Sequence, residues 1–379
     1  MKSGNDALEK LRLAFFKIDD SLNRAVRAKD DSAVAQVANN INLKIYQALP
    51  ILGFLLRSTN VRNAFELIEP LQSIAKQTMQ GTPALILSSE WDYVPFAYPQ
   101  SLDDLKSFVL IGLPASEAAT ALLVPIAGHE IGHAVWRNRG IEGSVAATIQ
   151  VHCEALYAHN AARFKRAFPE YIESDIVARE ILPEAIAQSV EYAVRQSEEL
   201  FCDLLAYSVF GPSYVHAFTY LLAPGTGEVD ARYPLNQTRV IVIQKIAKDE
   251  GVIIPNFKDL GFLSEARRGD HRHKFIVEMA ETSVEKIIPG IWASVSKIVD
   301  KNVTRPDETR ARHHLRDFKV GVPAASPICI GDIINAGWLY HGEIISSEKN
   351  PDVVSERLYL LNEVLLKTIE VLEFNKRTQ

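Results

Sequence analysis

The sequence predicts an α+β fold that is predominantly helical, with one small sheet near the middle of the chain. Long stretches repeat apolar residues every three or four positions, which is the period of an amphipathic helix. Between residues 84 and 114 this repeat gives way to short aliphatic and aromatic runs bounded by Pro, Gly and Ser, as in strands. The 379 residues, of which 47% are hydrophobic, are enough for two or three domains.

The order of these patterns predicts three parts. Residues 1–80 form an N-terminal helical region, in which Leu8, Leu11, Phe15 and Ile18 share one helical face. Residues 81–250 hold the predicted strands and the candidate site, and residues 251–379 form a C-terminal helical region. The predicted strands are ALILSS (84–89), WDYVPFAYP (91–99) and SFVLIGLP (107–114). The helices predicted after them cover about 125–138, 144–166, 170–195 and on to 210, and the C-terminal loops lie near 251–257, 266–271 and 320–327.

Composition and charge narrow the functional classes. A net charge of −6 argues against general binding to a nucleic-acid backbone, and the basic runs 267–274 and 310–319 contain acids as well. Three cysteines in so long a chain imply no disulfide framework and fit a reducing compartment. The N-terminus has no apolar signal region, and the apolar runs 49–56 and 121–128 are too short to span a bilayer. We therefore expect a cytoplasmic protein without a transmembrane segment.

The sequence AGHEIGHA contains His129, Glu130 and His133, the pattern of a zinc site. Histidines four residues apart lie on one face of a helix, one turn apart, and can share one zinc ion. Glu130 then faces the open coordination position and can take a proton from a zinc-bound water. Given the His and Glu content of the chain, this pattern has a chance probability of roughly one or two per cent.

Two glycines accompany this motif. Gly128 and Gly132 each cost about 1 kcal/mol in a helix relative to alanine. Glycines one turn apart predict that another segment packs very close to the zinc helix. A third histidine at the metzincin spacing is absent, since Trp136 and Arg139 occupy the positions of its glycine and histidine. A third ligand is therefore expected from another segment.

The segment SEELFCD (197–203) is the candidate for that ligand. Glu199 and Asp203 are four residues apart, so the two carboxylates repel each other on a bare helix. The repulsion is relieved if Glu199 binds Zn²⁺ and Asp203 accepts an N–H from a ligand histidine. Glu198 is an alternative ligand. Cys202 is either a small residue that lets two helices approach or a thiolate ligand.

HEIGH followed by a helix with E-x-x-x-D resembles a gluzincin zinc metallopeptidase. Glu199 follows His133 by 66 residues, a separation similar to that in the HtpX and CAAX-prenyl-protease group. The segment RYPLNQTRV (232–240) is similar to the H-P-x-x-x-x-R segment of that group, with Tyr233 in place of its histidine. The soluble ImmA-like group is a second relative, because ELFCDLLA (199–206) fits its ligand helix. The resemblance covers about residues 105–245 and implies a zincin-like core.

The resemblance implies a zinc-dependent peptidase that acts on a peptide or protein substrate, with Glu130 as general base. The candidate donors to the oxyanion are Tyr233 first, then Arg239, His216 and Tyr207. SFVLIGLP is a candidate edge strand for pairing with an extended peptide. The alternatives are a helical binding or scaffold protein with a structural or silent zinc site, and an ImmA-like regulatory peptidase that cuts one partner protein. The sequence leaves the substrate and the oligomeric state open.

Overall fold

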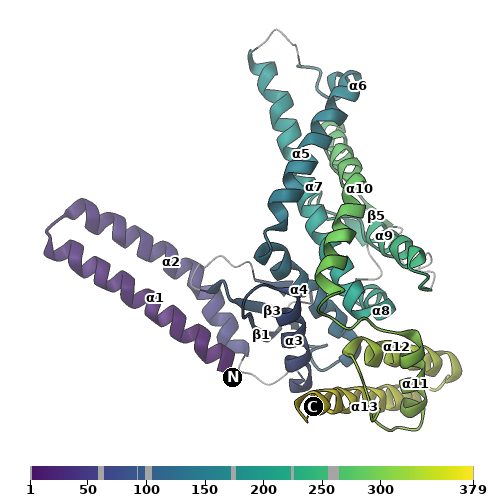
Figure 1. Ribbon diagram of the computed structural model, residues 1–379. Helices are drawn as coiled ribbons and strands as arrows, with labels where there is room; N and C mark the ends of the chain where they lie inside the picture. The colour runs from purple at the N-terminus through teal and green to yellow at the C-terminus, as the bar shows by residue number, and fades with distance from the viewer. Residues whose placement is uncertain are drawn as a thin grey trace.

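Helices dominate the computed structural model, and a small sheet lies near its centre (Figure 1). The structure describes residues 2–58, 64–91, 93–98, 105–171, 176–222, 226–254 and 264–378. The helices are α1 (Lys2–Arg27), α2 (Asp31–Ser58), α3 (Ile68–Thr78), α4 (Val124–Asn138), α5 (Ile141–His159), α6 (Ala161–Ala167), α7 (Ile176–Phe210), α8 (Pro212–Leu222), α9 (Asn236–Asp249), α10 (His271–Val299), α11 (Glu308–Lys319), α12 (Ile330–Ser347) and α13 (Pro351–Thr378). The predicted α+β class with predominant helix is confirmed.

The central sheet has the strand order β1-β3-β2 within the described residues. Strands β1 (Ala84–Glu90) and β3 (Phe108–Pro114) are parallel, and both are buried along almost their whole length. Strand β2 (Phe96–Ala97) pairs with β3 in the antiparallel direction, so β3 is the central strand. The prediction that residues 107–114 form an edge strand is therefore wrong. A nearly continuous apolar strand is typical of the middle of a buried sheet, where both faces are covered.

Two further details differ from the sequence prediction. Of the stretch 91–99, only the two residues of β2 form a strand, and Asp92 and Pro99 lie outside the described residues. A second, parallel pair of short strands, β4 (Thr226–Glu228) and β5 (Ser264–Ala266), was not predicted. Three-residue strands carry too little periodicity to be recognised in a sequence.

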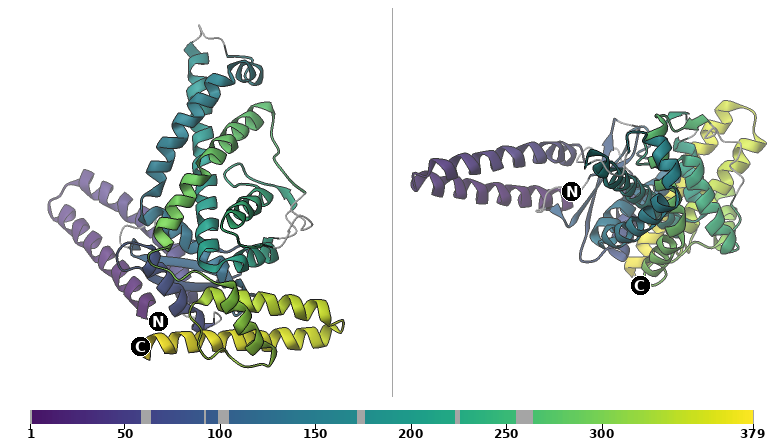
Figure 2. Two further views of the ribbon diagram at one scale, coloured as in Figure 1. Left: turned by 45° about the vertical axis from the view of Figure 1, so that its right-hand side comes forward. Right: turned by 90° about the horizontal axis from the view of Figure 1, so that it is seen from above.

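The helices form three groups around the sheet. Helices α1 and α2 form a hairpin that projects from the centre, while α5, α7 and α10 pack together as a long arm that points in another direction (Figures 1 and 2). Helices α11, α12 and α13 gather at the base of the arm. Helix α7 belongs to both the arm and the centre, where it packs along α4.

One large apolar core joins the centre to the C-terminal helices. It contains residues from Leu67 to Leu372 and includes the fully buried Trp136 and Phe201. A second core lies where the hairpin of α1 and α2 covers β1 and β3. The predicted division at residues 80 and 250 stays a prediction. Among the helices that the structure describes, none is both long and apolar enough to cross a bilayer.

Candidate metal centre

Helix α4 presents His129 and His133 toward α7. Pro125 lies in its first turn, where a missing N–H costs no helical hydrogen bond. The two imidazole rings are 5.1 Å apart between centroids, with an angle of 84° between their planes. His129 is buried and His133 is nearly so. The predicted helix and the common face of the two histidines are therefore both present.

The two glycines of α4 allow α7 to approach closely. A Cβ atom added at Gly132 would lie 2.7 Å from Cα of Cys202 and 2.9 Å from its Cβ. A Cβ added at Gly128 would lie 2.5 Å from the ring of Phe210 and 3.7 Å from Cβ of Ala206. Both distances at Gly132 are shorter than a carbon–carbon contact allows. The prediction that another segment packs very close to these glycines is confirmed, with Cys202 against Gly132 and the ring of Phe210 against Gly128.

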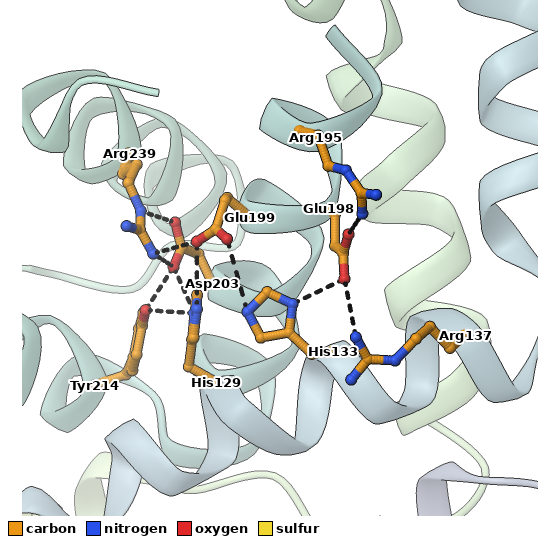
Figure 3. A network of polar contacts seen from close by, with 9 residues as sticks. All are labelled: His129, His133, Arg137, Arg195, Glu198, Glu199, Asp203, Tyr214 and Arg239. Carbon is orange, nitrogen blue, oxygen red and sulfur yellow. Dashed lines mark hydrogen bonds and ion pairs between the residues drawn. The ribbon is translucent and has the colours of Figure 1, made fainter. Parts of the chain in front are cut away.

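Glu199 lies opposite both histidines (Figure 3). Its Oε2 atom is 3.5 Å from Nε2 of His129, and its Oε1 atom is 3.6 Å from Nε2 of His133. These distances exceed those of ordinary hydrogen bonds. Two ligand atoms bound to one tetrahedral zinc ion, with bonds of about 2.0–2.2 Å, are about 3.4 Å apart. Each oxygen of Glu199 thus lies at about this separation from one of the two Nε2 atoms.

The Nδ1 atom of each imidazole ring lies within hydrogen-bonding distance of a carboxylate. Nδ1 of His129 lies 2.9 Å from Oδ1 of Asp203, and Nδ1 of His133 lies 2.9 Å from Oε1 of Glu198. When each Nδ1 donates its proton to a carboxylate, each Nε2 keeps a lone pair that is directed toward Glu199. The predicted role of Asp203 fits this geometry. The partner of the second histidine is Glu198, which the sequence had suggested only as an alternative ligand.

Asp203 is fully buried and is held by two further groups. Arg239 donates to its two oxygens at 2.7 and 2.6 Å, and the hydroxyl of Tyr214 donates at 2.5 Å. Burial by itself would raise the pKa of Asp203, but the Arg239 guanidinium and His129 hold it below its usual range. The sequence did not single out Tyr214, because this side chain reaches Asp203 only through the turn at Gly211 that joins α7 to α8.

Cys202 is the second candidate for a third ligand. Ligand atoms of His129, His133 and Cys202 all lie within 4.8 Å of one another, so this buried group could hold a metal ion. The thiol is completely buried against Gly132, and burial raises its pKa well above the ordinary value. A protonated thiol is a poor ligand. The geometry of Cys202 thus fits both a ligand and the small packing residue that the sequence suggested.

Glu130 lies in the same cleft as the two histidines and is buried. Burial raises its pKa above the ordinary value, although His129 and His133 act against this effect. A carboxylate whose pKa is raised is a stronger base than one exposed to water. Glu130 therefore lies beside the histidine pair in an environment that raises the pKa of its carboxyl group.

The cleft has a volume of about 650 Å³ and is walled by α4, α7, α8, strand β2 and the segment around Tyr233. Tyr233 is half-exposed, and Arg239 forms part of the buried wall, where its Nη2 lies 3.4 Å from Glu199. The candidates His216 and Tyr207 line a different cavity, between α7, α8, α11 and α12. Of the four suggested oxyanion donors, the structure brings Tyr233 and Arg239 to the histidine pair and leaves His216 and Tyr207 elsewhere.

The histidines and acids of this cluster come from α4 and α7, and Tyr214 and Arg239, which hold Asp203, come from α8 and α9. No protein-family model matches the chain, and no match was found among curated proteins or among solved structures.

Proposed function

We propose that the chain is a zinc-dependent peptidase in which His129, His133 and Glu199 hold the ion. One observation carries this proposal. Both Nε2 atoms face the two oxygens of one carboxylate at 3.5 and 3.6 Å, while each Nδ1 atom is held by a carboxylate of its own. A bare charge cluster would form short hydrogen bonds between the Nε2 atoms and Glu199, and it needs no orienting partner on the far side of each ring.

The donor set fits catalytic zinc better than structural zinc. Two imidazoles and one carboxylate leave a fourth position open, as catalytic sites do. Structural sites fill all four positions, usually with thiolates. If Cys202 also bound the ion, no coordination position would be left for water and the site would be inactive. Whether Cys202 binds the ion in addition to Glu199 therefore decides between a peptidase and the alternative of a binding protein with a structural zinc.

The proposed chemistry is hydrolysis of a peptide bond. Zinc would lower the pKa of a water molecule toward about 7 and polarise the scissile carbonyl. Glu130 would take the proton of that water and pass it to the leaving amine. Tyr233 is half-exposed on the cleft wall and is our candidate to donate a hydrogen bond to the carbonyl oxygen. Arg239 is held by Asp203, so we assign it a positioning role.

The sheet edge next to the cleft supports a peptide as the substrate. Strand β2 is at the edge of the central sheet as far as the described residues extend, and Val94 to Ala97 line the cleft. An extended peptide can add to such an edge as one more strand. This arrangement, with an HExxH helix, an ExxxD helix and an edge strand, is our reason to propose a zincin-like core related to the gluzincins.

The test is to measure zinc content and cleavage in the full chain and in Glu130→Gln. This variant keeps the ligands, so we expect one zinc per chain and loss of cleavage of unfolded casein and of a mixed peptide library. Glu142→Gln removes an exposed carboxylate of α5 and serves as the control. Less than about half a zinc per chain in gently purified protein, or unchanged cleavage by Glu130→Gln, would refute the proposal.

A second candidate is a binding protein, or a regulatory peptidase that cuts one partner. The hairpin of α1 and α2 favours it, since no residue from 15 to 47 is buried and Phe16, Leu43 and Tyr46 are exposed there. Exposed apolar side chains on a projecting hairpin would suit contact with a partner protein. Bound zinc without cleavage of any peptide would support the silent version. Cleavage of a single purified partner but of no generic peptide would support the regulatory version.

A further inference from the structure

Two arginines lie beside the candidate site and are not fully paired. Arg137 follows His133 by one turn on α4, and Arg195 precedes Glu198 by one turn on α7. Both side chains line the cleft, on either side of Glu198 (Figure 3). Arg137 is 28% exposed and Arg195 is 52% exposed, so both can be reached by a ligand in the cleft.

One carboxylate serves both guanidinium groups and a histidine. Oε2 of Glu198 accepts from Arg195 at 3.1 Å, and its Oε1 accepts from Nδ1 of His133 at 2.9 Å. Arg137 approaches Oε1 only to 3.9 Å, which is too long for a hydrogen bond. Its Nε atom is buried and has no hydrogen-bond partner among the described residues. The guanidinium of Arg137 is therefore held to Glu198 by a long ion pair and not by a hydrogen bond.

The distribution of charged residues in the cleft also favours a negatively charged ligand beside Arg137 and Arg195. Four arginines and three glutamates line it among the described residues, in a chain whose net charge is −6. Arg239 is neutralised by Asp203, and Arg232 by Asp230. Arg137 and Arg195 share the single charge of Glu198, so the excess positive charge lies at their end of the cleft.

We propose that Arg137 and Arg195 bind a carboxylate of the peptide substrate. This inference rests on the proposed peptidase function and adds the substrate class. A guanidinium presents a planar fork of donors that matches a carboxylate. Four residues of a helix advance about 6 Å, and an extended peptide advances about 3.3 Å per residue. The bound carboxylate therefore belongs to a residue within about three positions of the scissile bond, either as an acidic side chain or as the chain terminus.

The test uses the zinc-loaded full chain and a mixture of synthetic twelve-residue peptides in matched pairs. Each pair differs only by Glu or Gln near the centre, and each peptide is made with a free and with an amidated C-terminus. Mass spectrometry of the mixture over time gives the relative kcat/KM within each pair. We expect the acidic member, or the member with the free terminus, to be cleaved about tenfold faster or more. A preference for Glu over Gln identifies an acidic side chain as the source of the carboxylate, and a preference for the free over the amidated end identifies the chain terminus.

Variants connect the preference to the two arginines. In Arg137→Gln combined with Arg195→Gln the ratio should fall to near one, and in Arg137→Lys it should be intermediate, because lysine keeps the charge but loses the fork. Arg166→Gln removes an exposed arginine of α6 and should leave the ratio unchanged. Because each ratio compares two peptides on one enzyme, a general loss of activity does not affect it. A ratio near one in the unmodified enzyme, or an unchanged ratio in the double variant, would overturn the inference.

A binding measurement separates this inference from the peptidase proposal. If no peptide is cleaved, the proposed function fails, and fluorescence anisotropy with labelled Glu and Gln peptides still tests the arginine pair. Binding of the Glu peptide about tenfold more tightly than the Gln peptide, with the difference lost in the double variant, would support the pair as a carboxylate site. Equal binding of the two peptides would refute it.

Discussion

Replacing Gly132 with alanine tests the packing that brings the two halves of the site together. The added methyl would lie 2.7 Å from Cα of Cys202, an atom of the backbone that no rotamer change can move away. Helices α4 and α7 must therefore separate, by roughly 0.7–1 Å to reach an ordinary carbon contact. This movement carries His129 and His133 away from Glu199.

Two opposing effects determine the stability of this variant, namely the gain in helix propensity and the cost of overpacking. Alanine favours a helix over glycine by about 1 kcal/mol, whereas overpacking a core costs about 1–3 kcal/mol. For Gly132→Ala the free energy of unfolding should fall by about 0–2 kcal/mol. Gly342→Ala is the matched control, because Gly342 is exposed inside α12 and an added Cβ meets nothing within 4 Å. That variant should gain about 1 kcal/mol.

Two assays follow the change. Urea denaturation of chelator-treated protein gives the stabilities, and competition with a chromogenic chelator gives the zinc affinity. We expect the affinity of Gly132→Ala to fall by about ten- to a hundredfold, comparable to the loss of an orienting group. Gly342→Ala should keep the affinity of the original chain. If Gly132→Ala gained as much stability as Gly342→Ala and kept its zinc affinity, the close approach of α4 and α7 would not hold the site together.

Three further predictions concern the ligands and their partners. Glu199→Gln should lose most of its bound zinc and Cys202→Ala should keep it, as metal analysis after dialysis can show; the reverse result would make the thiol the third ligand. Asp203→Asn should lower zinc affinity by about ten- to a hundredfold. It should also lower the free energy of unfolding by about 3–5 kcal/mol, because Arg239 loses its buried partner; a stability unchanged in urea denaturation would contradict this. In metal-free protein, burial alone would lower the pKa of His129, but Asp203 and Glu199 raise it to about 10. The stability that protonated His129 contributes is then complete below about pH 6.5 and lost as the pH rises toward 10, so thermal unfolding should occur at a lower temperature at pH 10 than at pH 6. Equal unfolding temperatures at the two pH values would contradict this assignment.

The sequence was sufficient where a short spacing on one rigid helix decides the geometry. His129 and His133 are four residues apart, so any helix through this segment brings them to one face. The glycines at 128 and 132 indicated a close neighbour for the same reason, since they make sense only where a side chain would collide. The pair Glu199 and Asp203 was found by their mutual repulsion on one helical face.

The sequence was not sufficient where the geometry depends on how one helix is rotated against another. Glu198 and Glu199 are consecutive, so they point about 100° apart around α7, and either could be turned toward the histidines. The packing of Cys202 against Gly132 fixes that rotation, and it directs Glu199 to both Nε2 atoms and Glu198 to Nδ1 of His133. The edge position of β2 likewise depends on which strand pairs with which, and a two-residue strand gives no pattern to read.

The sequence by itself thus determined a predominantly helical α+β chain, the two histidines with Glu130, and the helix that carries the remaining acids. Tertiary structure decided which acid faces the Nε2 atoms of the histidines, and it brought Tyr214 of α8 and Arg239 of α9 to Asp203. The physical reason is that some constraints act between neighbouring residues of one helix and others act between distant parts of the chain. Spacing along a helix is local and is written in the sequence, whereas the rotation and approach of two helices depend on the packing of all the side chains between them.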